Sequence, residues 1–271
     1  MDLTTLPDTK NWLIFTDLDG TLLDHHDYSF TAAQPALKQL KQRGIPVIIN
    51  SSKTLAEIAQ ISSDLDMNTP QIAENGSIIF DPEEKQTHIL GADYTTICQV
   101  LDALRREHGY CFNGFHDWSA EQIVEHTGLS LQSARNAAQR QGSEPLLWED
   151  DEALIENFRQ HLKQHGLELK RGGRFWHVMG QTDKVEAMHF VQKHLNNNSK
   201  AFTIALGDSA NDKDMLTAAN VAIIVNNPKG TAFTIDANKR PTPNHLIKTT
   251  LEGPAGWNET IMQLLQGSTA N

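Results

Sequence analysis

The stretch Trp12-Leu13-Ile14-Phe15-Thr16-Asp17-Leu18-Asp19-Gly20-Thr21 (WLIFTDLDGT) joins a run of apolar residues to an acidic turn. The apolar run has the length and composition of a buried strand, and Gly20 lets the chain turn after it. Side chains alternate along an extended segment, so we expect Asp17 and Asp19 to lie on the same side. Both follow the carboxyl end of the strand, which is the edge where open α/β sheets bind their ligands.

Strands and helices alternate on both sides of the middle of the chain, which predicts a parallel sheet covered by helices. In the first block we expect helices at residues 31–43 and 55–65 and strands at 45–49, 71–73 and 77–80, the last two joined by a turn at Asn75-Gly76. In the last block we expect helices at 184–195 and 211–219 and strands at 201–206 and 221–225. The predicted fold class is α/β, with a Rossmann-like parallel sheet as its core.

The middle of the chain has a different pattern of short, separated strands and helices. Strands are expected at residues 87–90, 145–148, 167–170 and 175–179, with helices at 94–108, 119–126, 130–140 and 151–165. We interpret this part as an inserted α+β domain. The predicted organisation is a catalytic core of residues 1–81 and 181–271 and a cap domain of residues 82–180, which sets substrate specificity and moves as a lid.

Composition excludes several classes of protein. The 271 residues are 39% hydrophobic and carry a formal net charge of −11, which favours a soluble globular protein and argues against nucleic acid as a partner. We expect the two cysteines, Cys98 and Cys111, to be reduced thiols. The first ten residues have no signal-peptide pattern, and no apolar run is long enough for a membrane helix. A cytoplasmic protein is therefore expected, and its oligomeric state is not indicated.

A second acidic cluster follows the strand expected at residues 201–206 and reads Gly207-Asp208-Ser209-Ala210-Asn211-Asp212. If this strand neighbours the first one, Asp17, Asp19 and Asp208 converge at one edge of the sheet. Their hard carboxylate oxygens suit Mg²⁺, which takes one or two carboxylates together with phosphate. Asp212 could reach the same site, or it could be a charge placed at a helix N-terminus.

Two further residues fit a phosphate site. Ser51 follows the second strand and offers a hydroxyl at the same edge, although a serine there could also be a helix N-cap. Lys184 begins a helix, where the dipole disfavours a cation, so a role in binding a ligand is favoured over a solvated lysine. We expect Asp17 to attack phosphorus and form an aspartyl-phosphate, with Asp19 as acid and then base. Mg²⁺, Ser51 and Lys184 would stabilise the charge on the transferring oxygens.

These motifs resemble those of the haloacid dehalogenase-like phosphatases. The resemblance rests on Asp17-Leu18-Asp19-Gly20-Thr21, the loop Ser51-Ser52-Lys53, Lys184 and the segment 207–212, in this order. It implies that Asp17 is the nucleophile and Asp19 the acid and base. It also implies that Mg²⁺ is held by the Asp17 side chain, the Asp19 backbone carbonyl and Asp208, and that the inserted domain is the α+β cap of one subfamily.

Further segments are similar to one branch of this family, the mannosyl-3-phosphoglycerate phosphatases. They are 51–54 (SSKT), 73–76 (AENG), 173–177 (GRFWH) and 252–257 (EGPAGW). The substrate implied by that branch is 2-O-mannosyl-3-phosphoglycerate, a small phosphorylated sugar acid. The residues expected to contact it are Ser52, Lys53, Glu74, Asn75, Arg174 and His177. Arg174 suits a carboxylate and His177 a sugar hydroxyl, but the arginines of this region could also be solvated charges.

Other functions stay open on the sequence alone. The same chemistry could serve another phosphate, such as a hexose phosphate, sucrose phosphate or a nucleotide-derived phosphate. A phosphoryl transferase would use the same residues and pass the phosphoryl group to a sugar. A non-catalytic carbohydrate-binding module on this fold is a third hypothesis, because a fold does not determine a function.

Overall fold

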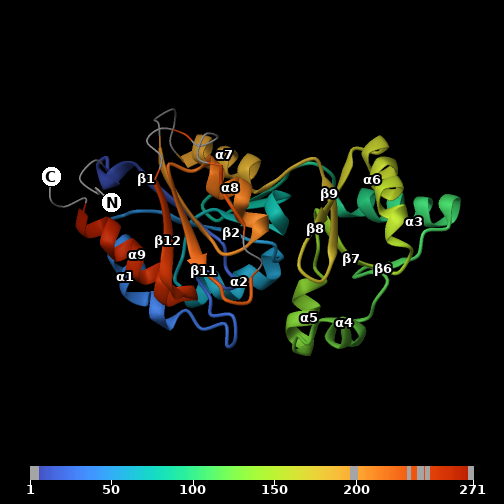
Figure 1. Ribbon diagram of the computed structural model, residues 1–271, viewed down its shortest axis with the longest axis horizontal. Helices are drawn as coiled ribbons and strands as arrows, with labels where there is room; N and C mark the ends of the chain where they lie inside the picture. Colours follow the sequence, from blue (N-terminus) through green and yellow to red (C-terminus); the bar gives the residue numbers. More distant parts are fainter. Residues whose placement is uncertain (1–5, 196–200, 231–232, 237–240, 242–244, 268–271) are drawn as a thin grey trace. The chain divides into compact units, whose positions relative to one another are not determined.

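The structure is a computed structural model that describes residues 6–195, 201–230, 233–236, 241 and 245–267 (Figure 1). The chain divides into two compact units, one formed by residues 1–51 with 188–271 and the other by residues 52–187. The second of the two boundaries falls within helix α7 (Lys184–Leu195).

The first unit contains a parallel sheet of five neighbouring strands. Their order is β12 (His245–Glu252), β11 (Val221–Asn226), β10 (Phe202–Gly207), β1 (Trp12–Thr16) and β2 (Val47–Asn50). All neighbours in this set run parallel. Every residue of β1, β2 and β10 is buried, as expected for strands covered on both faces.

Helices pack on both sides of this sheet (Figure 1). Helix α9 (Gly253–Gly267) packs on α1 (Gln34–Gln42), and α8 (Lys213–Ala218) packs on β10 and β11. Trp257 of α9 is fully buried, and its indole Nε1 donates a hydrogen bond of 3.1 Å to Thr16 Oγ1. This bond joins the last helix to the final residue of β1, so it supports the segment that carries Asp17. The short 3₁₀ helices of this unit are η2 (Thr9–Asn11), η3 (Thr31–Ala33) and η6 (Ala210–Asp212).

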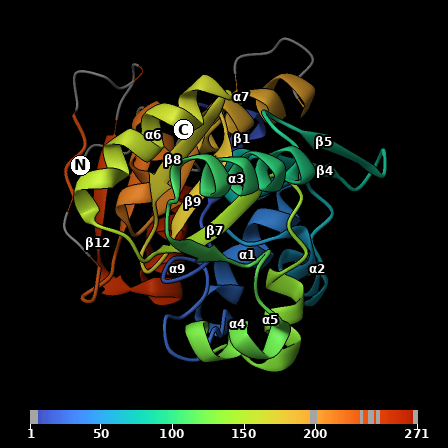
Figure 2. The ribbon, with the colours of Figure 1, turned by 90° about the vertical axis from the view of Figure 1, so that its right-hand side faces the viewer.

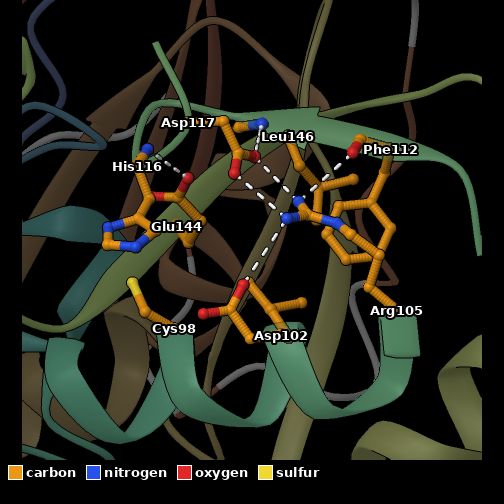
Figure 3. Close-up of a pocket in the computed structure, with 10 residues that line it drawn as sticks. Cys98, Asp102, Arg105, Phe112, His116, Asp117, Glu144 and Leu146 are labelled. Carbon is orange, nitrogen blue, oxygen red and sulfur yellow. Dashed lines mark hydrogen bonds and ion pairs between the residues drawn. The ribbon is translucent and has the colours of Figure 1, made fainter. Parts of the chain in front are cut away.

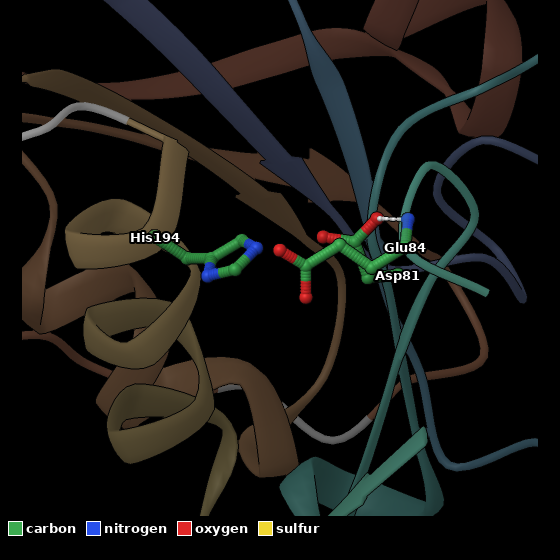
Figure 4. Close-up of side chains that lie close together, drawn as sticks. All are labelled: Asp81, Glu84 and His194. Carbon is green, nitrogen blue, oxygen red and sulfur yellow. Dashed lines mark hydrogen bonds between the residues drawn. The ribbon is translucent and has the colours of Figure 1, made fainter. Parts of the chain in front are cut away.

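The second unit begins with helix α2 (Leu55–Asp64) and the antiparallel strands β3 (Gln71–Ala73), β4 (Ile78–Asp81) and β5 (Gln86–Ile89). Thr54 caps α2 in a capping box with Glu57. The turn between β4 and β5 is held by Asp81, whose Oδ1 accepts backbone hydrogen bonds from Glu83 at 2.8 Å and Glu84 at 3.1 Å (Figure 4). Between β3 and β4 lies the 3₁₀ turn η4 (Glu74–Gly76).

The second unit also holds an antiparallel four-stranded sheet, in the order β6 (Phe112–Gly114), β7 (Ser143–Trp148), β9 (Trp176–Gly180) and β8 (Leu167–Arg171). Helices α3 (Tyr94–His108) and α6 (Ile155–Gln164) cover one face of it (Figure 2). Their apolar residues form a common core with those of the strands, such as Leu101, Phe158 and Val178. Helices α4 (Ala120–Thr127) and α5 (Leu131–Ala137) form a smaller core beside Phe115.

The predicted α/β fold class is confirmed, and most expected elements lie within a few residues of their predicted bounds. Two differences have physical reasons. The strand expected at residues 87–90 is β5, which pairs with β4 and not with the four-stranded sheet. Strand β12 was not predicted because it is largely exposed and lacks an apolar run, and β6 and α9 were not predicted either. The domain bounds 1–81, 82–180 and 181–271 remain a prediction.

Candidate active site

Strand β1 delivers Asp17 to the carboxyl edge of the parallel sheet. The backbone N–H of Asp17 donates to the carbonyl of Leu206 at 2.9 Å, so the ladder between β1 and β10 continues one residue beyond the strand. The chain then folds back in a tight loop, in which the Thr21 and Leu23 N–H groups both donate to the Leu18 carbonyl. This loop fixes the direction of the chain just after the carboxylate.

Asp208 lies at the end of the neighbouring strand β10 and accepts two side-chain hydrogen bonds from the same unit. Thr21 Oγ1 donates to its Oδ1 at 3.3 Å, and Asn227 Nδ2 donates to its Oδ2 at 2.5 Å. A Cβ atom at Gly20 would lie 2.7 Å from Asp208 Oδ2, and Gly20 has a φ of +73°. Glycine is therefore required there both for the backbone conformation and for the approach of this carboxylate.

Three buried carboxylates converge at this edge. Asp17, Asp208 and Asp212 each bring an oxygen within 4.8 Å of the others, a separation at which they could hold a metal ion. All three residues are at most 7% exposed. Like charges this close repel, and hard oxygen ligands suit a divalent cation such as Mg²⁺ or Ca²⁺. Of Asp17, Asp19 and Asp208, which were expected to converge, Asp17 and Asp208 belong to this group, together with Asp212.

Asp212 has a second role in the local structure. Its Oδ2 accepts hydrogen bonds from the backbone N–H of Asp208 and of Ser209, both at 3.2 Å, and from the Ser209 hydroxyl at 3.0 Å. These bonds form a capping box at the start of η6. The two interpretations of Asp212, as a helix-terminal charge and as a member of the acidic cluster, are thus compatible.

Asp19 and Ser51 follow strands of the same sheet. Asp19 is half-buried and forms an isolated bridge with Leu23 within the loop after β1. Ser51 is 1% exposed and follows β2, whose residue Ile49 is in register with Thr16 of β1. Ser51 therefore stands level with the loop that begins at Asp17.

In the second unit, four of the predicted substrate residues lie in two touching loops. The backbone N–H of Glu74 donates to the Lys53 carbonyl at 2.9 Å. Ser52, Lys53 and Asn75 are half-buried, whereas Glu74 is fully buried. Glu74 and Asn75 have φ values of +51° and +58°, a conformation that is costly for residues other than glycine.

Lys184 begins α7 beside the same turn. Asp183 caps the helix, because its Oδ1 accepts from the backbone N–H groups of Val185 and Glu186, both at 2.8 Å. A Cβ atom at Gly76 would lie 2.2 Å from the Asp183 carbonyl oxygen, so the turn and the helix start are in direct backbone contact. Lys184 is 3% exposed, and a lysine buried to this degree is unusual.

The sequence matches the haloacid dehalogenase-like hydrolase family over residues 14–235. The chain belongs to the haloacid dehalogenase-like hydrolases. Two relatives extend the match to nearly the whole chain, and both are glucosyl-3-phosphoglycerate/mannosyl-3-phosphoglycerate phosphatases. That of Methanococcoides burtonii is 37% identical and that of Persephonella marina 35%, each covering 93% of this chain and 97% of the relative. This hydrolase is accordingly a phosphatase, as the sequence motifs predicted.

Solved structures share the fold of this hydrolase. A haloacid dehalogenase-like hydrolase from Bacteroides thetaiotaomicron superimposes with a TM-score of 0.66 at 17% identity, over 93% of this chain and 98% of that one. One from B. subtilis gives a TM-score of 0.61 at 20% identity, with the same coverage. No helix among the described residues of the hydrolase is long and apolar enough to cross a membrane.

The two predicted substrate residues of the four-stranded sheet region differ in their surroundings. Arg174 precedes β9, is exposed and donates to the backbone carbonyl of His126 at the end of α4. His177 lies on β9 opposite Pro145, with its ring over Gly172, where a Cβ atom would meet Nε2 at 2.7 Å. Burial, together with the nearby charge of Arg140, lowers the pKa of His177 to about 3. The imidazole is therefore neutral at physiological pH and able to donate and to accept one hydrogen bond.

A buried carboxylate that the sequence did not single out is Glu144 of β7, which is 1% exposed (Figure 3). Its Oε1 accepts from the His116 backbone N–H and its Oε2 from the Tyr94 hydroxyl, both at 2.8 Å. Burial raises the pKa of Glu144 to about 7 despite these bonds. The pKa of the Cys98 thiol nearby is raised to about 12 by burial and by the charge of Glu144.

Sequence reasoning also missed Asn227 and Arg140. Asn227 lies 19 residues beyond Asp208, outside any recognised motif, and only the fold reveals that they are bonded. Arg140 lies at the end of a helical segment that reads as solvated, yet it is 8% exposed. No sequence signal marks it, because the acid that it faces, Glu74, is distant in the sequence.

Proposed function

We propose that this phosphatase is a Mg²⁺-dependent phosphomonoesterase that removes the phosphate of 2-O-mannosyl-3-phosphoglycerate or of its glucosyl counterpart. The observation that carries the chemistry is the convergence of the Asp17, Asp208 and Asp212 carboxylates at the carboxyl edge of the parallel sheet. The names of the two relatives support the substrate class. The mannosyl and glucosyl compounds share a phosphate, a carboxylate and a hexose.

The donor set of the first unit fits Mg²⁺. We propose that the carboxylates of Asp17 and Asp208 and the backbone carbonyl of Asp19 hold the ion, with Asp212 supporting the loop that carries Asp208. All of these donors are oxygens, the type that Mg²⁺ prefers. When bound, the ion neutralises charge on the phosphoryl oxygens and on the carboxylates around them.

The proposed reaction has two steps. An Asp17 carboxylate oxygen attacks phosphorus, the bond between phosphorus and the glycerate oxygen breaks, and Asp19 donates a proton to the leaving oxygen. Asp19 then takes a proton from a water molecule, which attacks the aspartyl-phosphate and frees Asp17. The products are the hexosylglycerate and inorganic phosphate, and Asp19 ends the cycle protonated, as it began.

The remaining predicted residues have supporting roles in this proposal. The Ser51 hydroxyl donates to a phosphoryl oxygen, and the Lys184 ammonium offsets the charge of the transferring group. Ser52, Lys53 and Asn75 contact the glycerate and the sugar. Arg174 binds the carboxylate, and the neutral His177 hydrogen-bonds a sugar hydroxyl. The carboxylate of Glu74, which was also predicted to contact substrate, is instead engaged by Gln141, Gly142 and Ser143.

Phosphate release from a substrate panel tests this proposal. The panel contains mannosyl- and glucosyl-3-phosphoglycerate, 3-phosphoglycerate, hexose phosphates and sucrose phosphate, each with Mg²⁺ and with chelator. We expect the two hexosyl-phosphoglycerates to give the highest kcat/KM and the chelator to abolish release. A simple sugar phosphate that matches them would overturn the substrate assignment, and release unaffected by chelator would overturn the metal. Transfer of phosphate to a sugar acceptor would indicate a phosphoryl transferase.

A further inference from the structure

Glu74 is a buried acid whose carboxylate is engaged on both oxygens. Its Oε1 accepts a hydrogen bond of 2.8 Å from the Gln141 backbone N–H. Its Oε2 accepts from the Gly142 backbone N–H at 3.1 Å and from the Ser143 hydroxyl at 2.9 Å. The Glu74 side chain is 1% exposed. These bonds tie the turn after β3 to the segment that enters β7.

Arg140 is the cation that faces Glu74. Its Nε lies 3.4 Å from Glu74 Oε2, and its side chain is 3% exposed. The same guanidinium donates to the Ser143 carbonyl at 3.0 Å, to the Ser143 hydroxyl at 2.5 Å and to the Ser52 carbonyl at 3.5 Å. Arg140 therefore reaches the loop of Ser52 and Lys53 as well as the turn at Glu74.

Two glycines bring these segments close enough to bond. A Cβ atom at Gly142 would lie 2.8 Å from Cβ of Ser77 and 3.0 Å from Cδ1 of Ile78, so the 140–143 segment packs directly on the end of the turn. On its other side the turn meets the start of α7, where Gly76 touches the Asp183 backbone. The ion pair thus contacts the Ser52-Lys53 loop and the turn at Asn75, and this turn contacts the start of the helix that bears Lys184.

We infer that Glu74 and Arg140 are positioning residues, which act on the reaction by fixing the loops that carry Lys53, Asn75 and Lys184. The carboxylate faces backbone N–H groups and a guanidinium, all within residues 52–187, and these contacts explain how the left-handed conformation of Glu74 is maintained. The inference deepens the proposed function and rests on it for the roles of those three residues. It changes the role of Glu74 from a substrate contact to a support.

The energetics of buried ion pairs make this inference testable. Removing one partner leaves the other charge buried without its counter-charge, which costs far more than removing both. A substrate contact behaves differently, because its loss is not repaired by a second change at Arg140. The double variant therefore distinguishes a supporting pair from a substrate-binding glutamate.

The experiment compares Glu74→Gln, Arg140→Met and the double variant in the full-length protein, with kcat and KM measured on mannosyl-3-phosphoglycerate and on p-nitrophenyl phosphate. We expect each single variant to lose about 100-fold in kcat/KM, the effect of a small misplacement of binding groups. The double variant should recover about tenfold of that loss. The matched control is Arg105→Met, which breaks the more exposed Arg105–Asp117 pair in the same unit.

Two results would overturn the inference. Single variants that lose no more activity than Arg105→Met would show that the pair does not matter for catalysis. A double variant whose loss equals the product of the single losses would show that the two residues act independently. If a single variant fails to fold, Ser143→Ala is the milder test, because it removes only the hydroxyl between the pair, with an expected loss of about tenfold in kcat/KM.

Amide hydrogen exchange tests whether Glu74 and Arg140 hold these loops in place, and it requires no activity measurement. In Glu74→Gln, we expect faster exchange in peptides covering residues 52–54 and 139–143, and unchanged exchange in α3 and α6. Equal protection of all these peptides in the wild type and the variant would overturn the inference. If the wild type releases no phosphate from any substrate, the proposed function is wrong. The exchange experiment would still test the structural role of Glu74.

Discussion

The two units of the chain treat buried carboxylates in opposite ways. In the first unit, Asp208 accepts hydrogen bonds from Thr21 and Asn227, and the carboxylates of Asp17 and Asp212 lie close to it. In the second unit, Glu74 faces a guanidinium and several backbone N–H groups. Carboxylates that crowd together repel one another and favour a cation between them, whereas a carboxylate paired with arginine is neutralised within the fold. The first arrangement suits chemistry and the second suits support.

The substitution Asp17→Asn is the strongest test of the catalytic role that this comparison gives to the first unit. Removing a nucleophile costs about 10⁴-fold or more in kcat, and thermal unfolding should show that the fold is kept. The matched control is Asp214→Asn, an exposed acid of α8 in the same unit, which should keep its activity. Steady-state phosphate release measures both, and Asp17→Asn with wild-type kcat would remove Asp17 from the reaction.

A second prediction concerns Glu144, a buried carboxylate that accepts from a backbone N–H and from a tyrosine hydroxyl. Its pKa is raised from 4.5 to about 7, so the folded state holds a proton that the unfolded state releases. Its contribution to stability is therefore present below about pH 4.5 and lost as the pH rises to about 7, by about 3 kcal/mol.

Glu144→Gln should remove this pH dependence. We expect the free energy of unfolding, measured with urea, to increase in the variant relative to the wild type as the pH rises from 5 to 8. The control is Glu125→Gln, which changes an exposed acid of α4. A constant difference between Glu144→Gln and the wild type across that range would contradict the pKa assignment.

Gly20→Ala tests the close approach of Asp208. Alanine at this position would have to adopt a φ of +73°, and its Cβ atom would lie 2.7 Å from Asp208 Oδ2. We therefore expect a loss of about 2 kcal/mol in the free energy of unfolding and a loss of activity as well. Gly44→Ala is the control, because Gly44 has a φ of +65° and a Cβ atom added there would meet nothing within 4 Å. Equal losses in the two variants, measured by urea unfolding, would show that the contact with Asp208 carries no cost.

The smallest expected effect comes from Asn227, which orients Asp208 without belonging to the acidic cluster. Asn227→Ala should raise the Mg²⁺ concentration for half-maximal activity about tenfold, the usual cost of losing a group that orients a metal ligand. Asn226→Ala is the control, because that side chain bonds to the Thr250 carbonyl instead. A Mg²⁺ titration that gives the same midpoint for the wild type and Asn227→Ala would contradict a role for Asn227 in metal binding.

The sequence predicted the parts of the fold and the site that depend on local pattern. Strand β1, the loop after it and the acidic segment after β10 could be read from a buried run followed by acids and glycine. The sequence left open whether β1 and β10 are neighbours, and the structure shows that they pair and bring Asp17 and Asp208 together.

What the sequence could not predict depends on contacts between distant residues. The Tyr94–Glu144 bond joins residues 50 positions apart, and Glu74 bonds to Ser143 across 69 positions. Helical periodicity places Arg140 at the end of a helix but says nothing about the acid it faces. Burial of polar side chains against one another has no periodic signal, so the supporting pair became visible only in the structure.

The most direct test of Asp17 as the nucleophile is to quench the wild-type enzyme with acid during turnover and to analyse its peptides by mass spectrometry. With mannosyl-3-phosphoglycerate and Mg²⁺ present, we predict a phosphoryl group on the peptide that contains Asp17, removed by hydroxylamine and missing in Asp17→Asn. Phosphate release without any phosphorylated peptide, or with the phosphoryl group on another residue, would contradict Asp17 as the nucleophile.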